Sequence, residues 1–151
     1  MALAADRSAL VGKEFSRRFR ADDEVTRLVL GALLAEFADA GIGADDCANA
    51  ELILAEVLNN VAEHAYAGLG GPVELNVRID TDGLDCLVID RGCGMPTGDA
   101  PNPGAPVLDA ANLPEGGFGW HIIRCLTSDL RYRRDGNRNR LMMVIPWVEA
   151  G

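Results

Sequence analysis

Apolar residues recur along the first half of the chain at helical spacing. After Asp22, which can cap a helix, one such series extends to Gly41, where glycine accepts the left-handed conformation that ends a helix; its members are Val25, Leu28, Val29, Ala32, Leu33 and Phe37. A second helix is predicted over residues 47–66, and it is apolar on most of its sides. Such a helix is typical of one that packs against a sheet.

The second half alternates apolar and polar residues, which predicts strands. Residues 72–80 have one apolar face and residues 84–89 are apolar throughout, so we expect a hairpin around Thr81-Asp82-Gly83 with the second strand more central. A last hairpin is predicted from residues 130–134 and 138–146. A poorer alternation over residues 11–19 predicts an edge strand.

Residues 96–115 contain five prolines and show no periodicity. A loop of this length inside a compact domain is usually functional or mobile, so we predict a lid, with an idle insertion as the alternative. A third helix is expected over residues 117–127. The order is β-α-α-β-β-lid-α-β-β. We therefore predict one α+β domain over residues 1–151, a two-layer sandwich with a mostly antiparallel sheet and helices on one face.

Composition excludes several classes of protein. The 151 residues carry a formal charge of -9, which makes general binding to nucleic acid unfavourable. No apolar stretch is long enough for a membrane span, and no signal peptide is evident, so we expect a cytoplasmic protein. The sequence contains no C-x-x-C pair, so a zinc site is not expected. Two of the cysteines, Cys86 and Cys125, are expected to be buried.

Arginines are concentrated near the C-terminus. Five of them fall within ten residues: Arg131, Arg133, Arg134, Arg138 and Arg140. This cluster indicates either the solvated face of a hairpin or a docking surface for an acidic protein partner.

The second helix carries a narrow polar stripe on an otherwise apolar surface. Glu56, Asn60 and His64 are spaced by four residues, so they stay near one side of a regular helix and drift by about 40° per step. Asn60 offers an oxygen ligand suited to Mg²⁺, and Glu56 offers a base one turn away. A helix edge that meets water is the alternative.

The segment Asp90-Arg91-Gly92-Cys93-Gly94 follows a central strand. A carboxylate at Asp90 could accept a hydrogen bond from an adenine amino group, while the glycines let a ring approach the backbone. A plain turn is the alternative. The spacing does not fit a dinucleotide fingerprint, and no P-loop pattern is present.

Residues Gly116-Gly117-Phe118-Gly119 precede the third helix. Free N–H groups at a helix start favour phosphate, and glycine allows close approach. Phe118 belongs to this loop, although packing is the more common role for Phe118 and Trp120.

These three motifs, in this order and with a lid between the second and third, resemble the Bergerat-fold ATPases. Within that superfamily the chain is most similar to the anti-sigma factor serine kinases, over roughly residues 10–147. The family motif E-x-x-x-N-x-x-x-H matches Glu56, Asn60 and His64, and D-x-G-x-G matches Asp90, Gly92 and Gly94. The family's G-x-G at the start of the third helix matches Gly117 and Gly119, and the Gly-Asn of its last hairpin matches Gly136-Asn137. The Gly-Thr of some relatives is absent, and Asn137 or Asn139 could replace that threonine.

The resemblance implies a role for each motif. Asp90 would bind the adenine amino group, and Asn60 would hold Mg²⁺ against the phosphates of ATP. Gly117 and Gly119 would contact phosphate oxygens, and Glu56 would act as the base. His64 would either touch phosphate or only pack.

The resemblance also implies a function. We expect a serine/threonine kinase that phosphorylates an anti-sigma antagonist of the STAS type and sequesters a sigma factor, with a homodimer possible. The alternatives are a nucleotide-gated binding module without kinase activity and the catalytic subunit of a split histidine kinase. No helical hairpin that presents an acceptor histidine is predicted.

Overall fold

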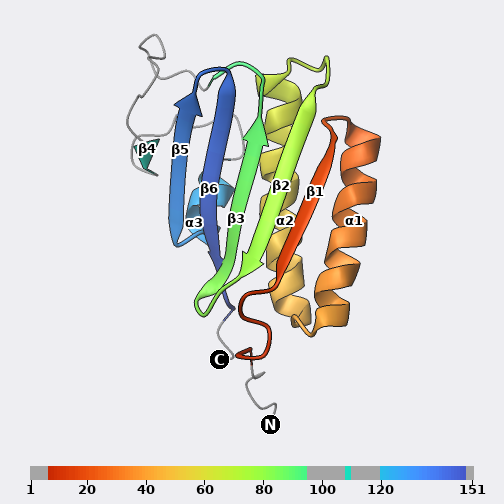
Figure 1. Cartoon of the computed structure of the whole chain (residues 1–151), viewed down its shortest axis with the longest axis vertical. Helices are drawn as coiled ribbons and strands as arrows, with labels where there is room; N and C mark the ends of the chain where they lie inside the picture. The colour runs from red at the N-terminus through yellow and green to blue at the C-terminus, as the bar shows by residue number, and fades with distance from the viewer. Residues whose placement is uncertain (1–6, 95–107, 110–119, 149–151) are drawn as a thin grey trace.

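The computed structural model, which describes residues 7–94, 108–109 and 120–148, has a six-stranded sheet as one layer and helices as the other (Figure 1). The strands are β1 (Glu14–Arg20), β2 (Pro72–Ile79), β3 (Gly83–Asp90), β4 (Leu108–Asp109), β5 (Asp129–Asp135) and β6 (Arg138–Pro146). Their order across the sheet is β1-β2-β3-β6-β5-β4, and every pairing is antiparallel. The predicted α+β sandwich is confirmed.

The helices are α1 (Asp23–Ala40), α2 (Ala44–Asn60), the π-helix η1 (Val61–Ala65) that continues α2, and α3 (Trp120–Leu126). In Figure 1, α2 and α3 lie behind the sheet, and α1 lies to the right, beside β1. Asp22 caps α1 by accepting hydrogen bonds from the backbone N–H groups of Glu24 and Val25, and Gly41 ends it with a φ of 108°. Both ends of this helix agree with the prediction.

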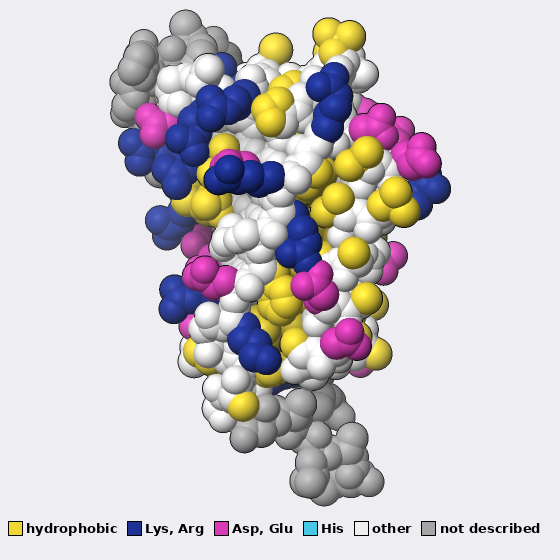
Figure 2. Space-filling view, turned by 45° about the vertical axis from the view of Figure 1, so that its right-hand side comes forward, with side chains coloured by type: hydrophobic (Ala, Val, Ile, Leu, Met, Phe, Trp, Pro, Cys, Tyr) yellow, Lys and Arg dark blue, Asp and Glu magenta, His cyan; other side chains and the backbone are white. Residues whose placement is uncertain are grey.

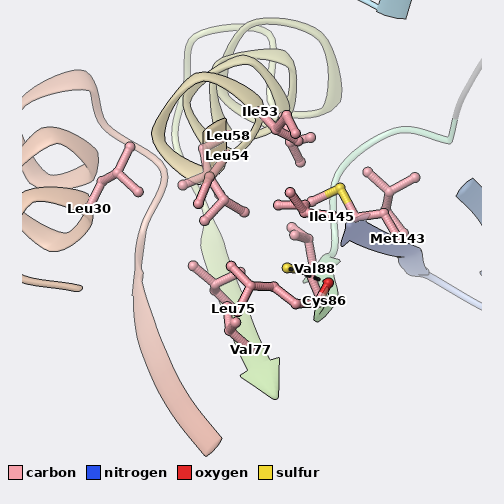
Figure 3. Packing of buried hydrophobic residues seen from close by; sticks show 14 of the residues in the cluster. Leu30, Ile53, Leu54, Leu58, Leu75, Val77, Cys86, Val88, Met143 and Ile145 are labelled. Carbon is pink, nitrogen blue, oxygen red and sulfur yellow. Dashed lines mark hydrogen bonds between the residues drawn. The ribbon is translucent and has the colours of Figure 1, made fainter. Parts of the chain in front are cut away.

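The core lies between the sheet and α1, α2 and α3, where side chains from alternate strand positions meet the helices (Figure 3). From the strands come Leu75, Val77, Cys86, Val88, Met143 and Ile145, and from α2 come Ile53, Leu54 and Leu58. The period of two in β2, β3 and β6 therefore selects which residues are buried. It also decides that Asp90 and Asn139, which are in the inward phase, face the helices.

One cysteine prediction is confirmed and the other is wrong. Cys86 is buried in β3, and burial raises the pKa of its thiol well above the ordinary value. Cys125 is exposed. It lies two residues after the fully buried Ile123, about 200° around α3, and so it points away from the core.

Most of the predicted lid, residues 96–115, lies outside the described residues. The exception is β4, which pairs with β5 through Leu108 opposite Tyr132 and Asp109 opposite Arg131. The predicted segment thus contributes an edge strand to the sheet, which its composition did not indicate. The first turn predicted for the third helix is also outside the described residues, and the described part of α3 begins at Trp120.

Candidate functional site

A pocket opens where α2 ends beside the last residues of β3. It is lined by Val57, Asn60, Val61, His64, Ala65, Val88, Asp90, Cys93, Gly94, Trp120, Tyr132, Asn139 and Leu141. Residues predicted separately from the helix stripe and from the D-x-G-x-G motif therefore meet in one place. The walls are mostly apolar, and the polar side chains lie among them, as in many small-molecule sites.

Asn60 is the last residue of α2 and is only 7% exposed. Its Nδ2 atom is buried and has no hydrogen-bond partner among the described residues. A buried amide without a partner is unfavourable, by about 1–3 kcal/mol. A ligand in the pocket could satisfy it. Because the amide can turn over, the same position could also present the oxygen.

The chain changes its winding immediately after Asn60. In η1 the N–H of Tyr66 bonds the carbonyl of Val61, an i→i+5 contact, so this turn is wider than an α-helical turn. The regular stripe expected from Glu56 to His64 therefore ends at Asn60. His64 still lines the pocket, but its side chain is 44% exposed.

Asp90 is 6% exposed at the end of β3. Its Oδ1 accepts hydrogen bonds from Asn139 Nδ2 at 2.7 Å and from the Gly92 N–H at 2.9 Å. Both of these bonds end on Oδ1, which leaves Oδ2 as the atom with which the carboxylate could accept from a bound ring. Burial raises the pKa of this carboxyl, while the two hydrogen bonds and the nearby Arg134 oppose the increase.

Asn139 connects the polar groups around Asp90. Its Nδ2 also donates to the carbonyls of Gly92 and Cys93, at 3.2 and 3.0 Å. Its Oδ1 accepts from the Tyr132 hydroxyl at 2.6 Å and from Arg134 Nη1 at 2.8 Å. Of the two asparagines considered from the sequence, the structure brings Asn139 to the pocket. Asn139 pairs with Asp90 across β3 and β6.

Tyr132 and Arg134 were not among the predicted site residues. Arg134 Nη1 donates to the Gly92 carbonyl at 3.0 Å as well as to Asn139, so it holds the glycine loop against β5. Both residues share the inward phase of β5, starting from the buried Leu130. That alternation is the sequence signal that could have identified them.

Gly92 and Gly94 lie where side chains would not fit. A Cβ at Gly92 would come within 2.3 Å of the Ala65 carbonyl oxygen, and one at Gly94 within 2.8 Å of Arg134 Cδ. The Cys93 N–H donates to that same Ala65 carbonyl at 2.7 Å. The glycines thus bring the loop after β3 against η1, which joins the two halves of the pocket.

Tyr66 fixes this junction from the other side. Its hydroxyl accepts from the Arg91 N–H at 2.7 Å and donates to the Pro72 carbonyl at 2.5 Å. A Cβ at Gly71 would come within 2.2 Å of the Tyr66 ring. Tyr66 therefore ties the end of η1 to β2 and to the Asp90 loop, a positioning role that the sequence motif did not indicate.

Glu56 does not line this pocket. It is half-buried and lines a separate groove between α1 and α2, together with Arg27, Gly31 and Glu51 among others. The drift of about 40° over four residues turns Glu56 toward α1 while Asn60 faces the sheet. The structure thus places the predicted base and the predicted metal ligand one helical turn apart, on two adjoining hollows. Gly117, Phe118 and Gly119 lie outside the described residues.

The described residues fit a nucleotide on chemical grounds. Among the described residues, both hydrogen bonds to the Asp90 carboxylate end on Oδ1, the buried Nδ2 of Asn60 has no partner, and both side chains line a mostly apolar pocket. Asn60 could serve as a hard oxygen ligand for Mg²⁺. None of the described helices is both long and apolar enough to cross a membrane.

Comparisons with known proteins identify relatives of this chain. The serine-protein kinase RsbW of Bacillus cereus strain AH187 is 25% identical over 105 residues, which cover 68% of this chain. The RsbW of Bacillus mycoides strain KBAB4 matches over the same shares at 25% identity. The matched region spans 66% of the length of these relatives. The predicted resemblance to the serine kinases is confirmed.

A solved structure shares the fold. The crystal structure of the RsbU and RsbW domains of Rv1364c from Mycobacterium tuberculosis superposes with a TM-score of 0.58 at 19% identity, over 89% of this chain and 32% of that one. The family described as "Histidine kinase-like ATPase domain" matches residues 19–145, which include α1, α2, the Asp90 loop and nearly all of the last hairpin. The chain therefore belongs to the histidine kinase-like ATPase domain family.

Proposed function

We propose that this protein is an ATP-dependent serine/threonine protein kinase that acts as an anti-sigma regulatory factor. The observation that carries the proposal is that one pocket is lined by both the Asp90 carboxylate and the Asn60 amide, whose buried Nδ2 has no partner among the described residues. The names of its relatives, serine-protein kinases, support protein serine as the acceptor.

In this proposal the pocket holds ATP through residues at its two ends. Asp90 Oδ2 accepts from the adenine amino group, and Asn139 holds the carboxylate in place by bonding Oδ1. Gly92 and Gly94 let the loop after β3 pack against η1 and Arg134, which places the Asp90 loop beside the pocket. Gly117, Phe118 and Gly119 are proposed, from the family resemblance, to contact the phosphates. His64 would lie at the phosphate end.

Asn60 is proposed to hold Mg²⁺. Bound there, the ion would neutralise charge on the phosphate oxygens. For this role the Asn60 amide presents its oxygen to the pocket, and its position at the end of α2 keeps it from being covered by a further α-helical turn.

Glu56 is proposed to accept the proton of the substrate hydroxyl. The serine oxygen then forms a bond to the γ-phosphorus as the bond from that phosphorus to the β,γ-bridging oxygen breaks, which gives phosphoserine and ADP. Glu56 lines the α1–α2 groove, whereas the nucleotide pocket lies on the other side of the last turn of α2. This placement favours a substrate hydroxyl that approaches beside α2.

The proposed protein substrate is an anti-sigma antagonist of the STAS type, and the proposed bound partner is a sigma factor. Both would be met in the cytoplasm, and two copies of the chain could form a homodimer. These partners rest on the family resemblance.

One observation favours a second function. Because Glu56 and Asn60 line different hollows, the site could bind nucleotide and change partner affinity without transferring phosphate. The protein would then be a nucleotide-gated binding module.

The test is phosphate transfer from labelled Mg-ATP to candidate antagonist-domain proteins of the same cell. We expect label on a partner serine, and a reduction of about 10²–10⁴-fold in Glu56→Ala with ATP affinity retained. Glu51→Ala is the matched control, since Glu51 lines the same groove on the same helix. Transfer at the normal rate in Glu56→Ala would exclude Glu56 as the base. ATP binding without label on any candidate would favour the binding module.

A further inference from the structure

The face of the sheet opposite the helices is not covered by any described element (Figure 1). Its side chains come from the outward positions of the strands, which are intermediate or exposed where the inward positions are buried. Figure 2 shows arginine side chains gathered toward one end of the molecule. At this end Arg133, Arg138 and Arg140 alternate along β5 and β6 with the inward-facing Arg134 and Asn139, so these three arginines are on the side of the sheet away from the nucleotide pocket.

These three arginines form no ion pair within the described part of the chain. Arg133 and Arg140 are directly opposite each other on β5 and β6, and Arg138 is the next outward residue of β6. Among the described residues none of the three forms an ion pair, although Asp135 is opposite Arg138 in the register. By contrast, Arg131 is paired with Asp129 at 3.2 Å, and Arg18 with Glu74 at 3.1 Å.

The three guanidinium groups also have unused donors. The Nε atoms of Arg133, Arg138 and Arg140 are buried and have no hydrogen-bond partner within the described part of the chain. Buried donors without acceptors are costly, and like charges directly opposite on neighbouring strands destabilise a sheet. An anion bound between these guanidinium groups would relieve the repulsion between like charges, so the arrangement favours an anionic ligand. We call Arg133, Arg138 and Arg140 the arginine cluster.

Apolar side chains adjoin the cluster on the same face. Ile89 is directly opposite Arg140, and Leu87 is directly opposite Met142, each pair joining β3 and β6. Ile89, Leu87 and Met142 are only partly buried. A ligand that used the cluster and this patch together would need negative charge and apolar groups side by side.

The charge of the whole chain restricts the kind of anion. A formal charge of -9 repels long polyanions such as nucleic acid at a distance, whereas a short acidic segment interacts mainly with the local cluster. A second copy of the chain is disfavoured where the two-fold axis passes near these arginines, because such an interface would place one arginine cluster near the other.

We propose that the outer face of β3, β5 and β6 docks an acidic protein segment that carries apolar side chains next to its carboxylates. The carboxylates accept from the arginine cluster, and the apolar side chains cover Leu87, Ile89 and Met142. This surface is independent of the nucleotide site, since Asn139 and Arg140 are adjacent residues that point to opposite faces of β6.

The test uses a fluorescent synthetic peptide built from alternating glutamate and leucine, and a control peptide with serine in place of leucine. Binding to the full chain is followed by anisotropy. We expect Arg133→Gln/Arg140→Gln to weaken binding by about tenfold or more, because two charge-assisted contacts are lost. Arg18→Gln/Arg78→Gln is the matched control and should change it by less than about twofold, since it removes the same charge from the outward positions of β1 and β2.

Three results would overturn the proposal. One is equal affinity of the cluster variant and the wild type. Another is equal affinity for the leucine and serine peptides, which would reduce the surface to a general anion site. The third is a wild-type dimer in sedimentation that dissociates in Arg133→Gln/Arg140→Gln, since the face would then be covered by a second copy. Both double variants remove surface charge only, so loss of folding is not expected to obscure the comparison.

Discussion

Asn139 and Arg140 are neighbours on β6, yet their surroundings differ sharply. Asn139 is 4% exposed, and both its amide oxygen and its amide nitrogen make hydrogen bonds to groups of the pocket. Arg140 faces the other side of the sheet, opposite Arg133, and its buried Nε has no partner among the described residues. Neighbouring residues of β6 thus belong to two different environments: Asn139 to a hydrogen-bonded network on the inner face, and Arg140 to a group of like charges on the outer face.

The comparison shows where this fold keeps binding capacity. On the inner face the network fixes Asp90, and the buried Nδ2 of Asn60, which has no partner among the residues that the structure describes, remains for a ligand. On the outer face the Nε atoms of Arg133, Arg138 and Arg140 are without a partner in the described ranges of the chain. A site that must hold a small molecule is more constrained than a surface that meets a flexible segment, so we expect the two faces to respond very differently to substitution.

The largest effect is expected from Asn139→Ala. It removes the partner of Asp90 and leaves the Tyr132 hydroxyl and Arg134 without an acceptor that they share. We expect a loss of about 2–4 kcal/mol in the free energy of unfolding, measured with urea. Arg140→Ala, one residue away, should change it by no more than about 0.5 kcal/mol. Equal losses for the two would mean that the network does not stabilise the fold.

Asp90→Asn comes next. An asparagine can still accept from Asn139 and Gly92, but it presents a weaker acceptor or a donor to the adenine amino group. We expect ATP affinity to fall by about 10–100-fold, since hydrogen bonds to a charged group contribute about 1.5–3 kcal/mol. Calorimetry of this variant is compared with Asp85→Asn, which changes an exposed aspartate on the outer face of the same strand. Unchanged affinity in Asp90→Asn would contradict the proposed orientation of the base.

The strands and the first two helices could be predicted because each has its own apolar period. The contact between Asp90 and Asn139 could not, because it depends on the register between β3 and β6, which are 49 residues apart at this point. The sequence limited the choice to two asparagines. The choice between Asn137 and Asn139 depends on where β6 begins and which of its residues face inward, and Asn139 is the inward-facing one.

The helix stripe was predicted less well for a geometric reason. A π-helical turn has no signature in the apolar pattern, so the end of the regular stripe at Asn60 was not foreseen. The turn of Glu56 toward α1 follows from the 40° drift that the spacing itself contains. Its consequence depends on the groove that α1 forms there, and α1 is distant in the sequence.

A smaller effect concerns the pH dependence of stability. Burial is the main cause that raises the pKa of Asp90 in the folded protein, whereas in the unfolded chain it returns to about 3.9. Between these two values the folded state keeps a proton that the unfolded state has lost, so the contribution of Asp90 falls as pH rises through this window. The free energy of unfolding of the wild type minus that of Asp90→Asn should therefore decrease from about pH 3.9 upward, and an increase would contradict the direction of the shift.

The smallest effect is expected on the outer face, and it should have the opposite sign to Asn139→Ala. Arg140→Thr relieves the like-charge pair with Arg133, so we expect a gain of a few tenths of a kcal/mol that shrinks as salt is added. Arg78→Thr is the informative control, because Arg78 is directly opposite Asp85 and its loss should destabilise slightly. Urea unfolding of both variants at low and high salt separates the two cases. If Arg140→Thr destabilises as Arg78→Thr does, then Arg133 and Arg140 do not repel one another in the free protein, and the arginine cluster stores no unfavourable charge for a partner to relieve.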